Sequence, residues 1–248
     1  MLEIDKKRSF LKVKEIWFSD TIFDVKHCQR LVFRACKKEF ERPDFQQERF
    51  TTLTLDLTKD LESIWQGMDK SSCRYAIHRA EEDGVKVFIN EHYKEFYGIY
   101  RQFNRNKGLP IGWWRPSDMQ QYGVLFTAAL NDKVIAGNFY LEDEGNIRWL
   151  LGASQRLENV TKQEKIIISN ASRLIIWEAI KYAKLKGKKE FDFGGYYTGI
   201  KPDKQKEGIN AFKKSFGGEI KTYYNYQKNY SILYKALFAI YSLVRQYL

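Results

Sequence analysis

Two apolar periodicities divide the chain into strands and helices. In the segment 50–57, Leu53, Leu55 and Leu57 alternate with polar residues, a period of two that predicts a half-buried strand. The apolar positions of 73–80 instead recur at intervals of three and four residues, which predicts an amphipathic helix that ends before Gly84. The chain therefore contains both kinds of element.

The same patterns predict the other elements. The N-terminal part has a predicted strand over 13–19, a helix over 25–40 and a short helix over 58–68 that Thr58 caps. From Gly84 onward the predicted order is strand, helix, helix, three antiparallel strands, long helix, strand, helix and strand. These elements are expected over 85–89, 93–103, 117–122, 124–130, 134–141, 147–152, 163–186, 190–193, 209–216 and 219–226, with a last helix over 231–247.

The charge balance narrows the classes of partner. Among 248 residues, 42 are Lys or Arg and 31 are Asp or Glu, which gives a net charge of +11. A surplus of this size favours polyanionic partners such as RNA, a phospholipid surface or a pyrophosphate-bearing substrate. A solvated basic surface is the alternative that the composition leaves open.

Cysteine use and hydropathy indicate the compartment. Cys28, Cys36 and Cys73 show no CxxC spacing, so neither a disulfide framework nor a metal site is predicted, and a reducing cytoplasm fits. Residues 1–10 lack the apolar segment of a signal peptide, and no segment reaches the roughly 18 apolar residues of a membrane span. We expect a cytoplasmic protein. The aromatic and basic last helix either docks on the protein or contacts an anionic membrane at its inner face.

One local motif carries candidate chemistry. The predicted strand 190–193 ends in Gly194-Gly195, and Lys213 lies on a short helix farther along the chain. Paired glycines let a ligand approach the backbone closely, and an ammonium group can stabilise an oxyanion or hold a phosphate. The alternative reading takes the glycines as turns and Lys213 as solvated.

Four segments together resemble the FemABX-like branch of the GNAT superfamily. They include Arg74 to Val85, Ala136-Gly137-x-Phe139, Asp192 to Gly195, and Gly208 to Gly218 with its Phe-Lys-x-x-Phe-Gly-Gly end, and they span roughly residues 50 to 226. The element order agrees. The resemblance implies an α/β (α+β) GNAT fold with a central mixed, mostly antiparallel sheet flanked by helices.

The resemblance also implies an activity. Relatives transfer an acyl or aminoacyl group to an amine, often on a cell-envelope precursor or a surface-polysaccharide sugar, and Fem proteins take the group from aminoacyl-tRNA. The donor here is expected as a co-substrate, acyl-CoA or aminoacyl-tRNA, with no bound cofactor. An acetyl-CoA-dependent amino-sugar acetyltransferase is one alternative. A non-catalytic RNA- or membrane-binding module is another, although the aromatic residues are scattered over helices and loops rather than gathered on one sheet face.

Roles follow for individual residues. Lys213 matches the family lysine that stabilises the negative charge at the reacting ester, and Asp192 is the candidate proton acceptor, or else bonds neighbouring amides. The candidate donor-binding residues are Phe212, Asn170, Arg173, Gly194 and Gly195. The candidate acceptor-binding residues are Arg74, Arg79, Trp113, Trp114, Arg115 and Tyr196, with a salt-bridged surface helix as the alternative for the two helical arginines.

The predicted domain organisation has three parts. Residues 1–70 form a small N-terminal module, an incomplete second GNAT-like half; 71–228 form the acyltransferase domain; and 229–248 form an amphipathic helix. The sequence departs from the family in two respects. Fem proteins carry two GNAT domains, and the stretch 155–172 contains no glycine where a CoA-binding loop is Gly-rich.

Overall fold

The computed structural model describes residues 1–8, 11–199 and 201–231. It contains two compact units, the first formed by Met1–Thr52 with Lys221–Leu248 and the second by Leu53–Ile220. These units are compact parts of the chain and have other bounds than the predicted domains. The predicted division at residues 70 and 228 therefore stays a prediction. The predicted last helix and its membrane contact lie outside the described residues from 232 onward.

The second unit is built on a mixed sheet. Its strand order is β4 (Gln46–Asp56), β9 (Glu190–Gly195), β8 (Asn146–Ser154), β7 (Lys133–Glu142), β6 (Gly123–Leu130) and β5 (Lys86–Ile89). Strands β6 to β8 are antiparallel neighbours, as predicted. Strand β5 pairs antiparallel with β6, and β8 pairs with β9 in parallel.

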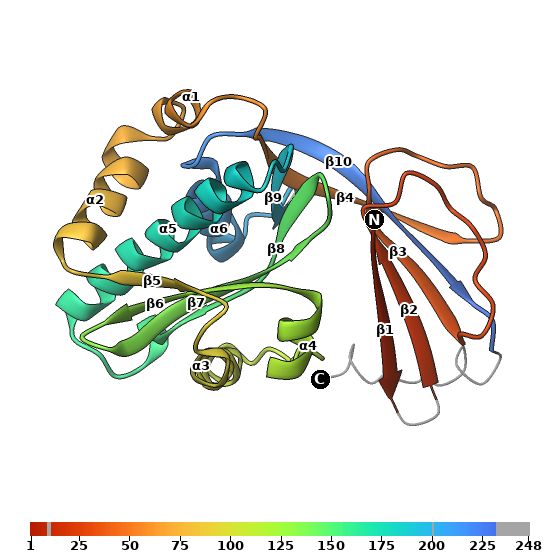
Figure 1. Cartoon of the computed structure of the whole chain (residues 1–248), viewed down its shortest axis with the longest axis horizontal. Helices are drawn as coiled ribbons and strands as arrows, with labels where there is room; N and C mark the ends of the chain where they lie inside the picture. The colour runs from red at the N-terminus through yellow and green to blue at the C-terminus, as the bar shows by residue number, and fades with distance from the viewer. Residues whose placement is uncertain (9–10, 200, 232–248) are drawn as a thin grey trace. The chain divides into compact units, whose positions relative to one another are not determined.

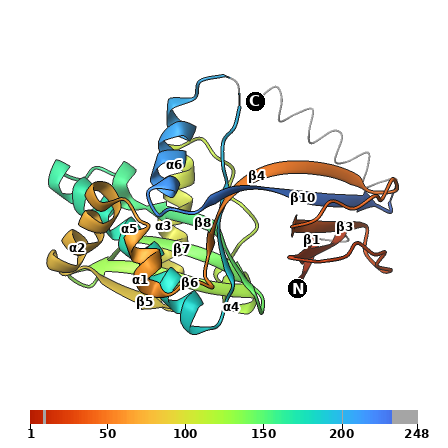
Figure 2. The same ribbon diagram turned by 90° about the horizontal axis from the view of Figure 1, so that it is seen from above.

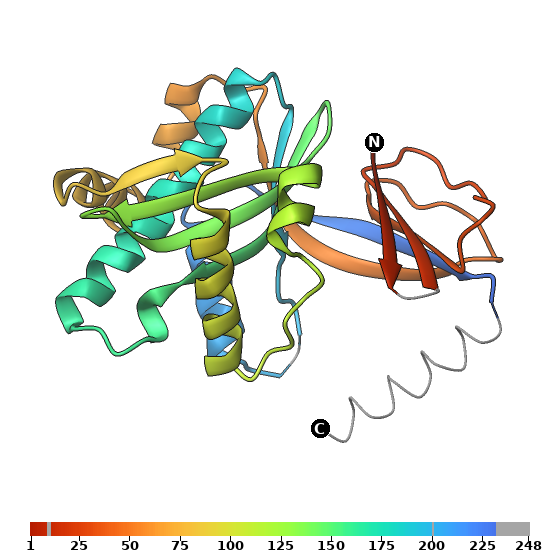
Figure 3. The same ribbon diagram turned by 60° about the horizontal axis from the view of Figure 1, so that its bottom comes forward.

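Helices cover both faces of this sheet. Helices α2 (Tyr75–Glu82) and α5 (Lys162–Leu185) pack together on one face, whereas α3 (Tyr93–Asn106) and α4 (Pro116–Tyr122) cover the other, as Figures 1 and 3 show. The remaining helices are α1 (Leu61–Gln66), a π-helical turn (Lys70–Arg74), a 3-10 turn (Gln155–Leu157) and α6 (Lys204–Lys214). The GNAT-like architecture predicted from the element order is present.

Helix α5 shows how the sequence sets these elements. Thr161 and Glu164 form a reciprocal capping box at its start, with the Thr161 amide donating to the Glu164 carboxylate at 2.7 Å. Ile168, Ile175 and Ala179 are buried along one face of the helix, in the core cluster that includes Phe191 and Phe193 of β9. The apolar face of the long helix therefore packs against the side of the sheet that carries Phe191 and Phe193.

The first unit has its own core. Strands β1 (Leu2–Arg8), β2 (Leu11–Trp17) and β3 (Arg30–Cys36) are followed in strand order by β10 (Glu219–Asn229) and β4. Figure 2 shows β10 and β4 running side by side. The core gathers apolar and aromatic side chains around the sheet: Ile16, Leu31, Phe33, Cys36, Phe45 and Tyr226.

The structure corrects several predicted elements. The predicted helix over 25–40 is wrong, because β3 occupies 30–36 with both faces largely buried, and such a continuous apolar run has no period that separates strand from helix. Strand β1 was not predicted, since its sequence LEIDKKR is mostly charged, as suits an edge strand. Asp60, not Thr58, caps α1, and α6 begins at Lys204 rather than 209 because Asp203 caps it.

The glycine pair after α6 is required for packing. Gly217 and Gly218 have φ values of 85° and 87°, a left-handed conformation that side chains disfavour. A Cβ on Gly218 would lie 2.5 Å from the carbonyl oxygen of Thr54, and one on Gly217 would lie 3.0 Å from that of Gly67. The end of the Phe-Lys-x-x-Phe-Gly-Gly motif therefore lets the chain pass close to β4 and to the end of α1.

We expect Gly218→Ala to lower the free energy of unfolding by about 3 kcal/mol, since it adds a backbone clash to an unfavourable φ. Gly208→Ala is the matched control: Gly208 lies inside α6 with open space around it, so alanine should stabilise the helix by up to about 1 kcal/mol. Urea denaturation of both variants gives the comparison. Equal stability of Gly218→Ala and wild type would contradict the packing role.

Candidate active site

The site begins where β8 and β9 stop pairing. Their parallel ladder ends at Arg148 opposite Asp192, although β8 continues to Ser154 and β9 to Gly195. On the other edge of β8, the register with β7 shifts so that Leu150 is an extra residue, and such a bulge re-aims neighbouring side chains. Beyond the Arg148–Asp192 pair, the ends of the two adjacent strands lie outside the ladder.

Lys213 occupies this position from α6. Its side chain is buried, with 7% of the residue exposed, and its Nζ donates to the carbonyl oxygen of Gly195 at 2.6 Å. The ammonium group also lies 5.7 Å from the centre of the Trp149 ring. The reading of Lys213 as a solvated surface lysine is therefore wrong.

Burial controls the charge of Lys213. Desolvation lowers the pKa of this ammonium to about 8; the Asp192 carboxylate opposes the shift and the Arg148 guanidinium adds to it. Lys213 is consequently still mostly protonated at neutral pH and loses its charge within the range in which enzymes are assayed. A pKa that burial and neighbouring charges shift in this way is typical of residues in functional sites.

Asp192 forms a buried ion pair with Arg148. The side chains are 3% and 11% exposed, and Arg148 Nη1 donates to Asp192 Oδ2. The other carboxylate oxygen accepts the Gly194 amide at 2.7 Å. This is the amide contact that the sequence left open as the alternative to proton transfer. We infer that Asp192 positions the Gly194-Gly195 corner and the charges beside Lys213.

The two glycines of this corner differ. Gly194 has a φ of 76°, and a Cβ there would lie 3.1 Å from the Trp149 carbonyl oxygen and 4.0 Å from Lys213 Nζ. Gly195 is exposed, and a Cβ on it would meet nothing within 4 Å. Gly194 thus needs to be glycine for its conformation, whereas Gly195 contributes its carbonyl oxygen.

Gly194→Ala should cost about 1–2 kcal/mol of stability, because alanine disfavours the left-handed conformation, and it should slow any reaction that depends on the position of Lys213. Gly195→Ala should leave stability unchanged within about 0.5 kcal/mol. Thermal unfolding of the two single variants provides the test. If both variants melt alike, the corner does not have the strain that its φ indicates.

Aromatic and basic side chains continue the site along α5 and α6. The Phe212 ring lies 6.3 Å from that of Trp149, and the Arg173 guanidinium lies 4.8 Å from the centre of Phe212. Burial lowers the pKa of Arg173, with Arg156 as a further cause. Arg173 Nε is buried, and nothing in the described chain bonds it. Asn170, half-buried, lies three residues earlier on α5.

The candidate acceptor residues differ from one another in their burial and contacts. Arg74 donates to the Gln66 side chain at 2.7 Å, and Tyr196 packs partly buried against the core. Arg79 forms ion pairs with Glu82 and Asp83 on α2, which matches the surface-helix alternative.

The Trp113-Trp114-Arg115 segment separates into exposed and buried members. Trp114 is buried and packs on Phe139 at a ring distance of 5.1 Å. Trp113 is 48% exposed, and Arg115, also exposed, is the N-cap residue of α4. Trp114 therefore anchors the loop in the protein core, whereas Trp113 and Arg115 are exposed to solvent.

The structure thus places five of the predicted site features close together: Lys213, Asp192, Phe212, Arg173 and the Gly194-Gly195 corner. The sequence analysis missed Arg148 and Trp149 of β8. A signal was present, since an arginine inside the apolar strand 147–152 needs a buried acceptor, but no local pattern identifies Asp192 as that acceptor.

Comparison with known proteins places the fold. No family model matches the chain, and no curated protein matches it. Among solved structures, FemX has 13% identity and a TM-score of 0.61, covering 92% of this chain and 83% of its own. The C-terminal domain of a putative lysylphosphatidylglycerol synthetase from Agrobacterium fabrum has 11% identity and a TM-score of 0.56, covering 92% and 80%.

A third structure, L-PGS from Bacillus licheniformis, has 13% identity and a TM-score of 0.52, covering 85% of this chain and 71% of its own. This chain has a FemABX/GNAT-like fold. The structural resemblance that the motifs predicted is therefore confirmed. Within the described part of the chain, no helix is long and apolar enough to cross a membrane.

Proposed function

We propose that this protein transfers an acyl or aminoacyl group from an activated donor to an amine, with Lys213 stabilising the oxyanion. The observation that carries the proposal is the buried Lys213 ammonium, held by the Gly195 carbonyl at 2.6 Å where the β8–β9 ladder has ended. A fold shared with FemX and with a putative lysylphosphatidylglycerol synthetase supports the class.

The proposed step needs one positive charge in a fixed position. The amine nitrogen attacks the carbonyl carbon of the donor ester or thioester, and the carbonyl electron pair moves to oxygen. An ammonium group has three N–H donors. One of those on Lys213 bonds Gly195, which leaves two for the oxyanion. Collapse of the intermediate restores the carbonyl and expels the donor's alkoxide or thiolate, which takes up the proton that the amine loses.

Burial supports this role for Lys213. Away from bulk water, a charge interacts more strongly with a developing oxyanion. The Gly195 bond and the Trp149 ring hold the ammonium in place before a donor arrives. A preorganised donor of this kind typically contributes 10²–10³-fold to the rate.

Phe212 and Arg173 support a neighbouring donor subsite. The Phe212 ring lies next to the Trp149 ring that faces Lys213, so an acyl chain or a base has an aromatic wall there. Arg173, whose guanidinium lies over the Phe212 ring, offers a cation for a donor phosphate, with Asn170 on the same helix. The donor acts as a co-substrate, either acyl-CoA or aminoacyl-tRNA.

The proposed acceptor is the amine of a cell-envelope precursor or of a surface-polysaccharide sugar. Half-buried Tyr196 and Arg74, together with exposed Trp113 and Arg115, are the proposed acceptor contacts. Lipid-linked or nucleotide-linked precursors carry phosphates, and the net charge of +11 favours such acceptors. A cytoplasmic location, with peripheral contact to an anionic membrane, belongs to the same proposal.

Isothermal titration with acetyl-CoA and with an aminoacyl-tRNA separates the two donors. Wild type should bind one of them, and Arg173→Gln should weaken that binding about tenfold, since a phosphate contact is worth about 1–3 kcal/mol. Arg101→Gln, on exposed α3 surface, is the matched control. If acetyl-CoA binds, an amino-sugar acetyltransferase is the form of the activity to assay; if neither donor binds, both donor proposals are wrong.

A further inference from the structure

The first unit contains a basic pocket that the proposed transferase site does not use. The pocket has a volume of about 410 Å³ and is lined by residues of β1, β2 and the turn before β3. Figure 1 shows these strands side by side. Asp5 lines the pocket together with five lysines: Lys6, Lys7, Lys12, Lys14 and Lys26.

Strand register forces part of this charge together. In the antiparallel β1–β2 pair, Lys7 lies directly opposite Lys12, and Asp5 lies opposite Lys14. Residues two apart share a face, so these four side chains project from the same side of the hairpin. Like charges directly opposite each other destabilise a strand pair. The Lys7–Lys12 pair therefore weakens the β1–β2 pairing, so these two lysines are not there for stability.

Acidic neighbours neutralise two of the five lysines. Lys14 Nζ lies 2.8 Å from Glu3 and 3.1 Å from Asp5, and Lys6 Nζ lies 2.9 Å from Glu15. Lys7, Lys12 and Lys26 form no ion pair with any residue that the structure describes. Three of the five lysines in the pocket thus have no acidic partner among the described residues.

Main-chain hydrogen bonds hold the third wall. The Gln29 amide donates to the Lys12 carbonyl oxygen at 2.9 Å, and the Lys12 amide donates to Gln29 Oε1 at 2.6 Å. Cys28, half-buried, packs against the core of the first unit. The turn that carries Lys26 is therefore hydrogen-bonded to β2, and Lys26 lines the same pocket as Lys7 and Lys12 of the hairpin.

We propose that this pocket binds a ligand through a phosphate or pyrophosphate group. Three unneutralised ammonium groups around one concavity suit a multiply charged anion. A volume of about 410 Å³ is also within the usual range of small-molecule sites. The group is either part of a soluble molecule or the headgroup of an anionic lipid, and the two sources share this chemistry.

Titration calorimetry with inorganic pyrophosphate tests the pocket on the full chain. Wild type should bind saturably, and the double variant Lys7→Gln/Lys12→Gln should bind at least tenfold more weakly. Lys38→Gln/Lys59→Gln removes the same charge from exposed positions outside the pocket and should change affinity less than twofold. Lys213→Met should also bind normally, which keeps this result independent of the proposed transferase activity.

Co-sedimentation with vesicles distinguishes the sources. One set contains phosphatidylglycerol in phosphatidylcholine, and the other contains phosphatidylcholine alone. A lipid-borne phosphate predicts binding to the anionic vesicles that Lys7→Gln/Lys12→Gln loses and Lys38→Gln/Lys59→Gln keeps. Pyrophosphate binding without vesicle binding identifies a soluble ligand. No binding of either probe, or equal losses in both double variants, would overturn the proposal.

Discussion

Lys213→Met should slow transfer strongly and at the same time stabilise the protein. Methionine fills a similar volume without a charge, so the oxyanion loses its buried donor and the rate should fall about 10²–10³-fold. A pKa lowered from 10.5 to about 8 means that the folded state disfavours the charged lysine, by about 3 kcal/mol at 1.36 kcal/mol per unit. After the hydrogen bond to Gly195 is lost, a net gain of about 2 kcal/mol is expected.

The sign of the pH dependence follows from the lowered pKa. Below pH 8, Lys213 is protonated in both the folded and the unfolded chain, so wild type carries the full cost of the buried charge. Between pH 8 and 10.5 the folded state loses the proton first, and the cost disappears. The stability advantage of Lys213→Met should therefore be largest at pH 7 and absent above pH 10.5.

Lys214→Met is the matched control for this prediction. Lys214 is the next residue of α6, but it is exposed and donates only to the Gly218 carbonyl oxygen at 3.1 Å. Its substitution should change stability by less than about 0.5 kcal/mol and leave transfer intact. Urea denaturation at pH 7 and pH 10 measures the stabilities. Destabilisation by Lys213→Met at pH 7 would show that Lys213 is a structural residue.

Asp192→Ala should destabilise the protein by about 3–5 kcal/mol, the usual cost of removing one partner of a buried ion pair. Arg148 would keep its charge at 11% exposure without the Asp192 carboxylate, and the Gly194 amide would lose its acceptor. Chemical denaturation of the purified variant gives the value. A loss below about 1 kcal/mol would be typical of an exposed pair, and would contradict the buried pair described here.

A double replacement separates the charge from the packing. Arg148→Met/Asp192→Leu removes both charges together, so it should recover most of the stability that Asp192→Ala loses. Glu82→Ala breaks the exposed pair with Arg79 on α2 and should have no measurable effect on stability. If the double variant is as unstable as Asp192→Ala, the loss comes from packing rather than from an uncompensated charge.

Local patterns were sufficient for much of the second unit. The stripes of apolar residues located the helices α2, α3 and α5, and alternation located β5. Turn residues at 131–133 and 143–145 and the glycines at 187 and 194–195 bounded β6 to β9, although β6 and β7 are buried on both faces. Local patterns failed in the first unit for physical reasons. Strand β3 is buried on both faces and has no period of two, and β1 is a charged edge strand whose pairing depends on β2.

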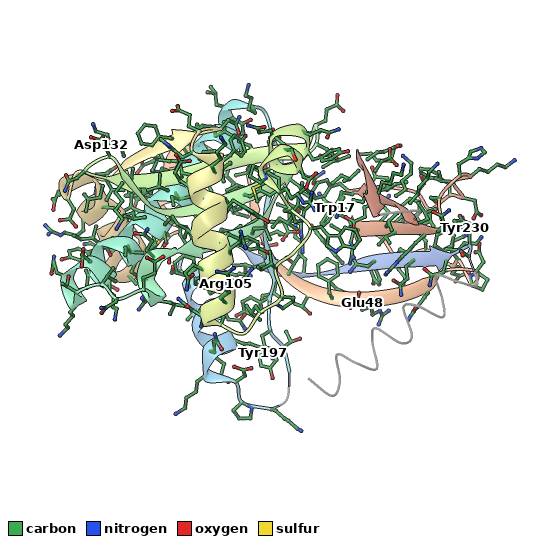
Figure 4. All side chains as sticks on the ribbon, turned by 90° about the horizontal axis from the view of Figure 1, so that it is seen from below. Trp17, Glu48, Arg105, Asp132, Tyr197 and Tyr230 are labelled. Carbon is green, nitrogen blue, oxygen red and sulfur yellow. The ribbon has the colours of Figure 1, made fainter. Side chains whose placement is uncertain are left out.

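The candidate site was predictable only in part. Lys213, Asp192 and the two glycines lie in a short motif, so the sequence identified them. Arg148 belongs to a different strand, and its pairing with Asp192 depends on the β8–β9 register. Figure 4 marks Tyr197 on the loop before α6, where Asn210 bonds its backbone at 3.0 Å and 2.7 Å. That contact, too, joins residues that no local pattern connects.

The most direct test of the proposed mechanism is the pH dependence of single-turnover transfer from the donor that titration identifies. If the protonated Lys213 stabilises the oxyanion, the wild-type rate should fall as pH rises through about 8, roughly tenfold per pH unit above it. The residual rate of Lys213→Met should lack this falling limb. A wild-type rate that stays constant or rises from pH 8 to pH 10, or the same falling limb in Lys213→Met, would contradict the proposal.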